Sequence, residues 1–189
     1  MSIPVSTRDD ALNAIVVTHL SLHSDFPGAI GANEIAGSRT AVTYATSSGG
    51  QRAQVSSLAI AVPPTTVRWI GAWNGAAFKF TMANGGATPK NFVAMPSTDQ
   101  IAVTAHGFAD GTKVAFFYGT PPGGLTEGVV YFTRDATADT LRVAPTLGGT
   151  AINLTGESSF GCVVSGITEA VHTSSGTHTI DATTMAVPT

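Results

Sequence analysis

One short segment, Ser21-Leu22-His23-Ser24-Asp25, contains a serine, a histidine and an aspartate. These residue types serve as nucleophile, base and orienting acid in serine hydrolases. Close neighbours in one loop rarely take the geometry that such a triad requires. The chain also lacks the G-x-S-x-G motif that marks many hydrolase nucleophiles. The segment therefore does not predict a serine hydrolase.

Histidine is the residue type here that could hold a metal ion. His19 and His23 lie four apart, which would align two ligands on a helix, but they fall on an expected strand and its end. His172 and His178 form a second weak pair. Neither an H-E-x-x-H motif nor a cysteine pair accompanies them, so we expect no metal and no cofactor. The five histidines, at positions 19, 23, 106, 172 and 178, are then surface or interface residues.

Other reactive groups are equally sparse. The single cysteine, Cys162, cannot form an internal disulfide and is expected to be a buried small side chain. Most acidic residues stand at a helix start or in turns, where carboxylates bind backbone amides, and not as the facing pair of a glycosidase. No catalytic residue is predicted. We expect a protein that is not an enzyme, with a glycan or peptidoglycan hydrolase as the enzymatic alternative.

Two tryptophans are the remaining candidates for binding. Val67, Trp69 and Trp73 alternate along an expected strand and so share one face. Tryptophans in this arrangement fill a sandwich core, form a subunit interface or provide a platform for stacking sugars. The sequence leaves all three roles open.

The element pattern predicts an all-β protein with one short N-terminal helix, capped by Ser6 or Thr7 with Asp9 and Asp10 in its first turn. After the helix, apolar and polar residues alternate, and glycine, proline or asparagine marks each break. Strands are expected at 18–22, 39–46, 54–62, 66–73, 78–82, 100–105, 113–118, 128–133, 140–144, 151–154 and 161–165.

A composition break with two prolines, at 87–99, suggests two domains. We predict an N-terminal β-sandwich of jelly-roll type at 1–92, which would be the docking domain, and a small Ig-like β-sandwich at 93–167. The segment 168–189 is either a tail or a strand that returns to the first domain. In the second case the second domain is an insertion in the first.

Composition narrows the class of function. Charged residues make up 11% of the 189 residues, against about 25% in an ordinary soluble protein. The net charge is −3, which argues against a nucleic-acid partner, and no apolar run is long enough to span a bilayer. A weakly charged surface of threonine, serine, glycine and asparagine suits a subunit held among neighbours.

Two stretches carry a resemblance. The first is Leu20–Gly28, Gly31–Ile35 and Arg39–Val42, followed by a Gly-rich turn and Trp69-Ile-Gly-Ala-Trp73. This pattern, over about residues 12–86, resembles the opening of small tail and virion proteins of tailed bacteriophages.

The second stretch resembles an Ig-like module found in phage structural proteins. Its matching segments are 101–107, 110–114, 124–131, 136–140 and 148–155. One departure is the run 132–135, where the family often has Val-Val-Asn, so that Arg134 is expected to make a contact of its own.

The resemblance implies a virion structural protein, assembled in the host bacterial cytoplasm, and most simply a minor tail or tail-tip component. The expected partners are other copies of the chain, with a trimer among the arrangements left open, and other phage virion proteins. Neither a membrane nor nucleic acid is expected as a partner. The residues predicted to make interface contacts are Trp69, Trp73, His23 and Phe26.

Two alternatives remain open. A head decoration protein that cements the capsid would need the same kind of small β-domain. A carbohydrate-binding adhesin for host attachment would have a surface glycan as partner, and it would require Trp69 or Trp73 to be exposed.

Overall fold

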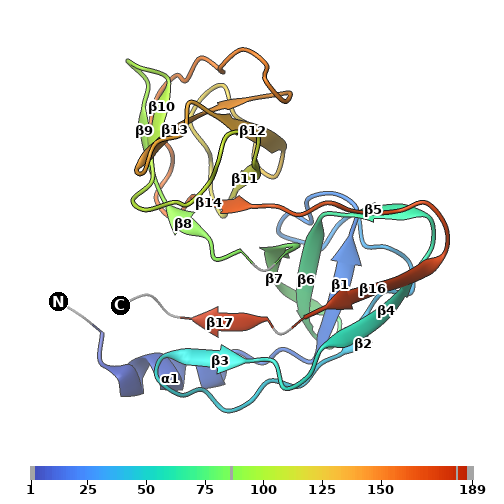
Figure 1. Cartoon of the computed structure of the whole chain (residues 1–189). Helices are drawn as coiled ribbons and strands as arrows, with labels where there is room; N and C mark the ends of the chain where they lie inside the picture. The colour runs from blue at the N-terminus through green and yellow to red at the C-terminus, as the bar shows by residue number, and fades with distance from the viewer. Residues whose placement is uncertain (1–2, 86, 182, 187–189) are drawn as a thin grey trace. The chain divides into compact units, whose positions relative to one another are not determined.

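The computed structural model describes residues 3–85, 87–181 and 183–186 (Figure 1). Residues 1–2 and 86 of the predicted domain 1–92, and residues 182 and 187–189 of the predicted C-terminal segment 168–189, lie outside the described residues. Strands account for 41% of the described residues and helix for 6%, and the sheets are antiparallel. The predicted all-β sandwich class with one short helix is confirmed.

The chain divides into two compact units. Unit 1 comprises Met1–Met82 and Ala170–Thr189, and unit 2 comprises Ala83–Glu169. The first boundary therefore follows Met82 and not residue 92. The reason is that β8 (Lys90–Asn91) pairs with a strand of unit 2, β14 (Val163–Gly166). Unit 2 is inserted between the two parts of unit 1.

Unit 1 begins with α1 (Val5–Ala14), the only helix in the described residues. The expected cap by Ser6 or Thr7 is wrong. The N-cap is Pro4, without a side-chain cap, and no acidic residue lies in the first turn. The Asp9 carboxylate instead accepts a hydrogen bond from the Gly50 amide at 2.8 Å, so it ties the helix to a turn. Within the described residues, no helix combines the length and apolar character needed to cross a membrane.

A four-stranded sheet of unit 1 has the order β2-β1-β6-β7. Its central pair is antiparallel, with Leu20 opposite Ala72 and Leu22 opposite Ile70. The strands are β1 (His19–His23), β2 (Thr40–Ala41), β6 (Trp69–Asn74) and β7 (Ala77–Ala83).

The C-terminal segment returns to unit 1 as one long antiparallel ribbon (Figure 1). Ala170 lies opposite Val67, His178 opposite Ile60 and Met185 opposite Arg52. The register therefore shifts by one residue between the first and second pairs and shifts back before the third. Prolines 63 and 64, which cannot donate ladder hydrogen bonds, separate two of its pieces. The pairs are β5 (Thr65–Val67) with β15 (Ala170–His172), β4 (Leu58–Val62) with β16 (Gly176–Ile180), and β3 (Gln51–Ala53) with β17 (Thr184–Ala186).

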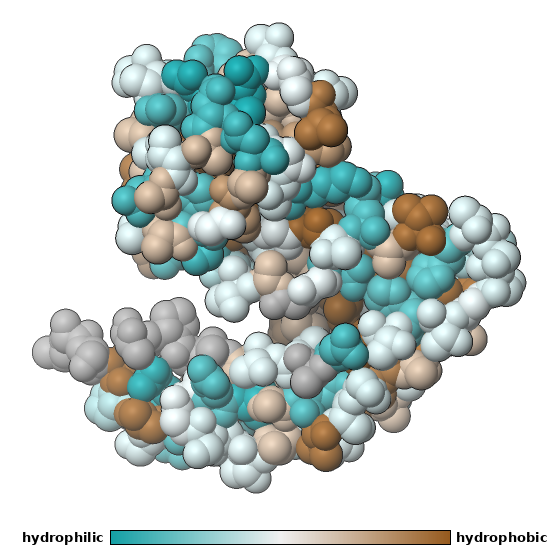
Figure 2. Space-filling model, in the orientation of Figure 1, coloured by the Kyte–Doolittle hydropathy of each residue, from teal (hydrophilic) through white to brown (hydrophobic). Residues whose placement is uncertain are grey.

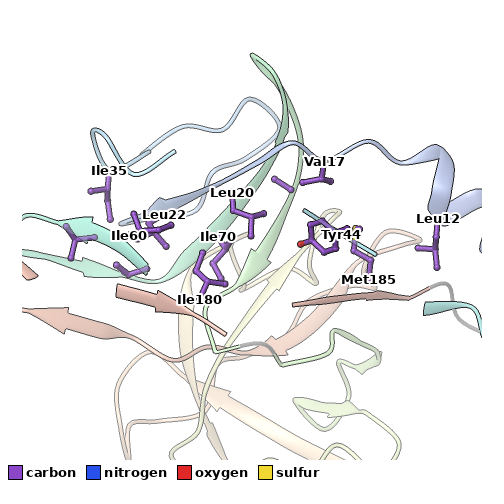
Figure 3. Packing of buried hydrophobic residues seen from close by; sticks show 13 residues of the cluster. Leu12, Val17, Leu20, Leu22, Ile35, Tyr44, Ile60, Ile70, Ile180 and Met185 are labelled. Carbon is purple, nitrogen blue, oxygen red and sulfur yellow. The ribbon is translucent and has the colours of Figure 1, made fainter. Parts of the chain in front are cut away.

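An aliphatic core joins the sheet, the ribbon and the helix of unit 1. In Figure 3, Leu20, Ile70 and Ile180 point toward one another, while Met185 lies beside Tyr44. Leu12 from α1 is part of the same cluster. The core therefore contains residues from both ends of the sequence. Its other buried members are Val17, Leu22, Ile35, Ile60, Val62, Val67 and Ala72.

Unit 2 is a seven-stranded antiparallel sheet of order β8-β14-β11-β12-β13-β10-β9. Residues from strands far apart in this order, such as Ile101 and Val164, belong to one hydrophobic cluster with Phe116 and Leu141. The sheet therefore curls over its own core. The remaining strands are β9 (Val93–Met95), β10 (Gln100–Ala102), β11 (Lys113–Phe117), β12 (Val130–Arg134) and β13 (Thr140–Ala144).

Candidate functional site

The two faces of the β1–β6 pair differ in kind. Side chains alternate across a strand, so Leu20, Leu22 and Ile70 face the aliphatic core. The other face carries the residues that we call the polar–aromatic cluster: Ser21, His23, Trp69, Gly71 and Trp73. The antiparallel register places Ser21 opposite Gly71 and His23 opposite Trp69.

A chain of hydrogen bonds runs through the polar–aromatic cluster. Trp73 Nε1 donates to Ser21 Oγ at 2.7 Å, and Ser21 Oγ lies 2.7 Å from His23 Nε2. His23 Nδ1 lies 2.6 Å from the carbonyl oxygen of Ala32. Because a carbonyl only accepts, Nδ1 carries the proton, and Ser21 donates its hydroxyl hydrogen to Nε2. Each of these side-chain polar groups is satisfied by its neighbour.

Electrostatics keeps His23 neutral. Burial lowers the pKa of His23 below its usual value, while the Ala32 carbonyl and the Glu34 charge act in the opposite direction. The side chain is fully buried. A neutral imidazole matches the hydrogen-bond roles assigned above, since a charged ring would have to donate from both nitrogens.

Two glycines leave the space that this cluster occupies. A Cβ on Gly71 would lie 2.4 Å from His23 Nε2 and 2.8 Å from Ser21 Oγ. A Cβ on Gly31 would lie 2.4 Å from the ring of Trp73, and Gly31 also has a φ of +75°. Both positions therefore require glycine, one for space and the other for space and backbone conformation.

Residues 24–39, which we call the clamp loop, cover the polar–aromatic cluster. The Ser24 amide donates to the Asn33 carbonyl, and the Asn33 side chain donates to the Phe26 carbonyl at 2.9 Å. Arg39 binds Glu34 through two hydrogen bonds, and its guanidinium lies 3.5 Å from the centre of the Trp73 ring. The loop is thus closed by bonds to itself and pressed onto the sheet by a cation–π contact.

The Ser21–His23 pair has the spacing of a nucleophile and its base. Ser21 is fully buried, however, and its oxygen already accepts from Trp73. Asp25 does not complete a triad, because its carboxylate accepts from the Phe26 amide at 2.8 Å. A substrate has no route to the serine in this arrangement, so the network holds the fold together.

The predicted interface residues fall in this same place. Trp69 and His23 are completely buried and Trp73 is 5% exposed, so these three side chains cannot offer a contact surface while unit 1 is folded. The cause is the clamp loop, which the sequence did not reveal as a cover. Phe26 is half-buried and packs edge-on against Trp69, with the ring centres 5.1 Å apart. The burial of both tryptophans also excludes them as a platform for sugars.

The other candidate groups lie elsewhere. His19 and His23 are four residues apart on β1, which separates their backbones by about 13 Å and excludes a shared ion. His172 and His178 do meet, with Nε2 of the first 3.3 Å from Nδ1 of the second. Cys162 is buried, and burial raises the pKa of its thiol to about 11, which makes it unreactive at neutral pH.

A shallow hollow of about 320 Å³ lies on unit 2, and sequence reasoning did not anticipate it. Arg134 lines it, donates to the Gly149 carbonyl at 2.5 Å and pairs with Asp135. Hydrogen bonds from Arg134 and Arg142 lower the pKa of Asp135. The charged groups therefore bind one another and a loop carbonyl, and this is the contact of its own expected for Arg134.

Comparison with models of protein families, with curated proteins and with solved structures finds no match to this chain.

Proposed function

We propose that this protein is a structural subunit of a tailed bacteriophage particle, a minor tail or tail-tip component that acts by assembly. The proposal is supported by what the residues of the first phage-like stretch do in the fold. Leu20–Gly28, Gly31–Ile35, Arg39 and Trp69–Trp73 together build the clamp loop and the polar–aromatic cluster. The shared pattern is thus one of folding and not of catalysis, as a scaffold for assembly requires.

The surface supports the same proposal. Charged residues are few, and large apolar side chains are exposed singly among polar ones; Figure 2 shows them as scattered spots on one face. Such a surface loses little side-chain entropy when neighbours cover it. The most exposed apolar residues are Ile30, Val55, Leu147, Phe160 and Val171.

Within unit 1, the clamp loop is the best docking element. Ile30 is 80% exposed, yet the loop that presents it is fixed by the Ala32 carbonyl on His23 and the Arg39–Glu34 pair. A rigid loop loses less entropy on binding than a flexible one. Ile30 replaces the buried tryptophans as the proposed contact residue.

Localisation on intact particles tests the proposal. Gold-labelled antibody against the chain should mark the distal tail in electron micrographs. Label spread evenly over the head would replace the tail assignment with capsid decoration. Particles without label, from cells that contain abundant protein, would overturn the structural role.

A matched pair of variants tests the docking element. Ile30→Asp should reduce incorporation into particles at least about tenfold, whereas Val171→Asp, at a similarly exposed position on the ribbon, should incorporate normally. Circular dichroism should show both variants folded. Equal incorporation of the two variants would mean that the clamp loop is not part of the interface. The location on the particle would still be tested by the gold label.

A further inference from the structure

Two histidine rings meet where the ribbon turns between β15 and β16. His172 lies opposite Thr65 and His178 lies opposite Ile60, so pairing with β5 and β4 fixes both backbones. His172 Nε2 is 3.3 Å from His178 Nδ1, the ring planes are inclined by 74°, and the ring centres are 5.6 Å apart. The fold thus places two imidazole nitrogens face to face.

The separation of these nitrogens matches the edge of a metal coordination tetrahedron. Two imidazole nitrogens bound at about 2.05 Å to one tetrahedral zinc ion lie about 3.3 Å apart, and their ring centres lie about 5.3 Å apart. At this nitrogen separation, the observed 5.6 Å between the ring centres means that the rings lie nearly end to end, as in an N–H···N hydrogen bond. Both rings, His172 half-buried and His178 buried, would therefore have to rotate about their side-chain bonds before their lone pairs meet at one ion.

Access and protonation also suit a metal ligand pair. His178 is 8% exposed, but residues 173–177 beside it are exposed, so an ion can approach from the turn. Burial and the neighbouring His172 lower the pKa of His178. A neutral imidazole keeps the lone pair that a transition metal needs.

We propose that His172 and His178 form a binding site for a divalent first-row transition-metal ion such as Zn²⁺, Ni²⁺ or Cu²⁺. Among the residues that the structure describes, no group of three or more histidine, cysteine, aspartate or glutamate side chains could hold a metal. The site therefore has two protein ligands, and water fills the other positions. Cu²⁺ binds most tightly of the three ions. The bound ion links the end of β15 to β16 and so stabilises the turn between them.

Calorimetric titration of the full-length chain, without any histidine tag, tests this site. We expect one Zn²⁺ per chain and a rise in melting temperature with added Zn²⁺. His172→Ala should weaken Zn²⁺ binding at least about tenfold, because it removes one of two ligands. His19→Ala, in the same unit but on β1, should bind as the unmodified protein does.

A second variant guards against misfolding. His178→Asn should also lose the ion, and circular dichroism should show that both ligand variants retain their strands. In nitrogen-15 spectra, Zn²⁺ should shift the signals of His172 Nε2 and His178 Nδ1. Absence of binding for all three ions, or unchanged affinity in His172→Ala, would overturn the proposal and leave the two rings as a hydrogen-bonded pair only.

Discussion

The two faces of the β1–β6 pair are made by alternate residues of the same strands but are held by different forces. On one face, Leu20, Leu22 and Ile70 pack against aliphatic side chains of the ribbon. On the other, Ser21, His23 and Trp73 are joined by hydrogen bonds of 2.7 Å or less to one another and to the Ala32 carbonyl. Burial is nearly complete on both faces.

The difference is one of tolerance. An aliphatic face stabilises in proportion to the area it buries, so a similar side chain costs little. A buried hydrogen-bonded face stabilises only if every donor and acceptor is satisfied, because one lost partner strands another polar group. The polar–aromatic cluster should therefore be much less tolerant of substitution than the aliphatic face.

The largest expected effect is that of Trp73→Ala. The change removes the ring under Arg39 and the donor to Ser21, and should lower the free energy of unfolding by about 3–5 kcal/mol. Urea denaturation followed by circular dichroism measures this loss, with the exposed Val171→Ala as control. Normal stability with impaired incorporation into particles would restore the interface role of Trp73.

Gly71→Ala should come next. The new Cβ would fall within 3 Å of both His23 and Ser21, so the cluster must shift, at a cost of about 3 kcal/mol. Gly176→Ala is the matched control, because its Cβ would meet its nearest neighbour, His172 Nδ1, at an ordinary 3.8 Å. Equal stability of the two variants in urea would mean that the cluster adapts as freely as an aliphatic core.

Ser21→Ala sharpens the comparison most directly. It strands the Trp73 donor and the His23 acceptor and should cost about 1–3 kcal/mol. Ile70→Val, which removes one methylene from the opposite face, should cost about 0.5–1.5 kcal/mol. If chemical denaturation shows Ile70→Val to be the more damaging change, the contrast between the faces is wrong.

The smallest effect concerns pH. Folding lowers the pKa of His23 and of His178, so the unfolded chain binds protons more readily than the folded one. Stability from neutral His23 is complete above its unfolded value of 6.5 and is lost as the pH falls through the lower folded value. Urea unfolding between about pH 8 and about pH 5 should show this decline. In His178→Asn the decline should be reduced but still present, and a flat profile there would mean that His23 is not held neutral.

Much of the fold could be predicted from local sequence. Thr140–Ala144 is a strand with the predicted bounds, and β10, β11, β12 and β14 lie close to predicted strands, because alternation and turn residues are local signals. β8 and β9 fall inside the break at 87–99, where no strand was expected. The predicted strand at 151–154 is not a strand in the structure. The Ile152 amide bonds to Val143, and the Leu154 amide bonds to the Asp99 side chain, not to a partner ladder.

In unit 1, the strand bounds and the burial of β6 depend on contacts with residues far away in the sequence, which a local pattern does not contain. The predicted strand 66–73 is interrupted at Arg68, whose side chain donates to the Ser24 carbonyl at 2.7 Å. The prediction that Trp69, Trp73 and His23 form an interface was wrong for a related reason. Alternation correctly placed Trp69 and Trp73 on one face, but the break at Arg68 puts Val67 in the aliphatic core instead. Nothing local to that strand indicated that residues 24–39 fold back over it. Glycine at 31 and the Glu34–Arg39 spacing were the available signals.

The ribbon of unit 1 sets an order of events during synthesis. Ile60 must wait for His178, and Arg52 for Met185, whereas unit 2 is an unbroken segment. Long-range pairing of this kind is slow because a large loop must close first. The two ends of unit 2 meet, since the Thr168 amide donates to the Asn84 carbonyl, so folding of unit 2 before the ribbon would shorten that loop. The inserted domain thus reduces the entropy cost of pairing the last strands of the chain with β3, β4 and β5.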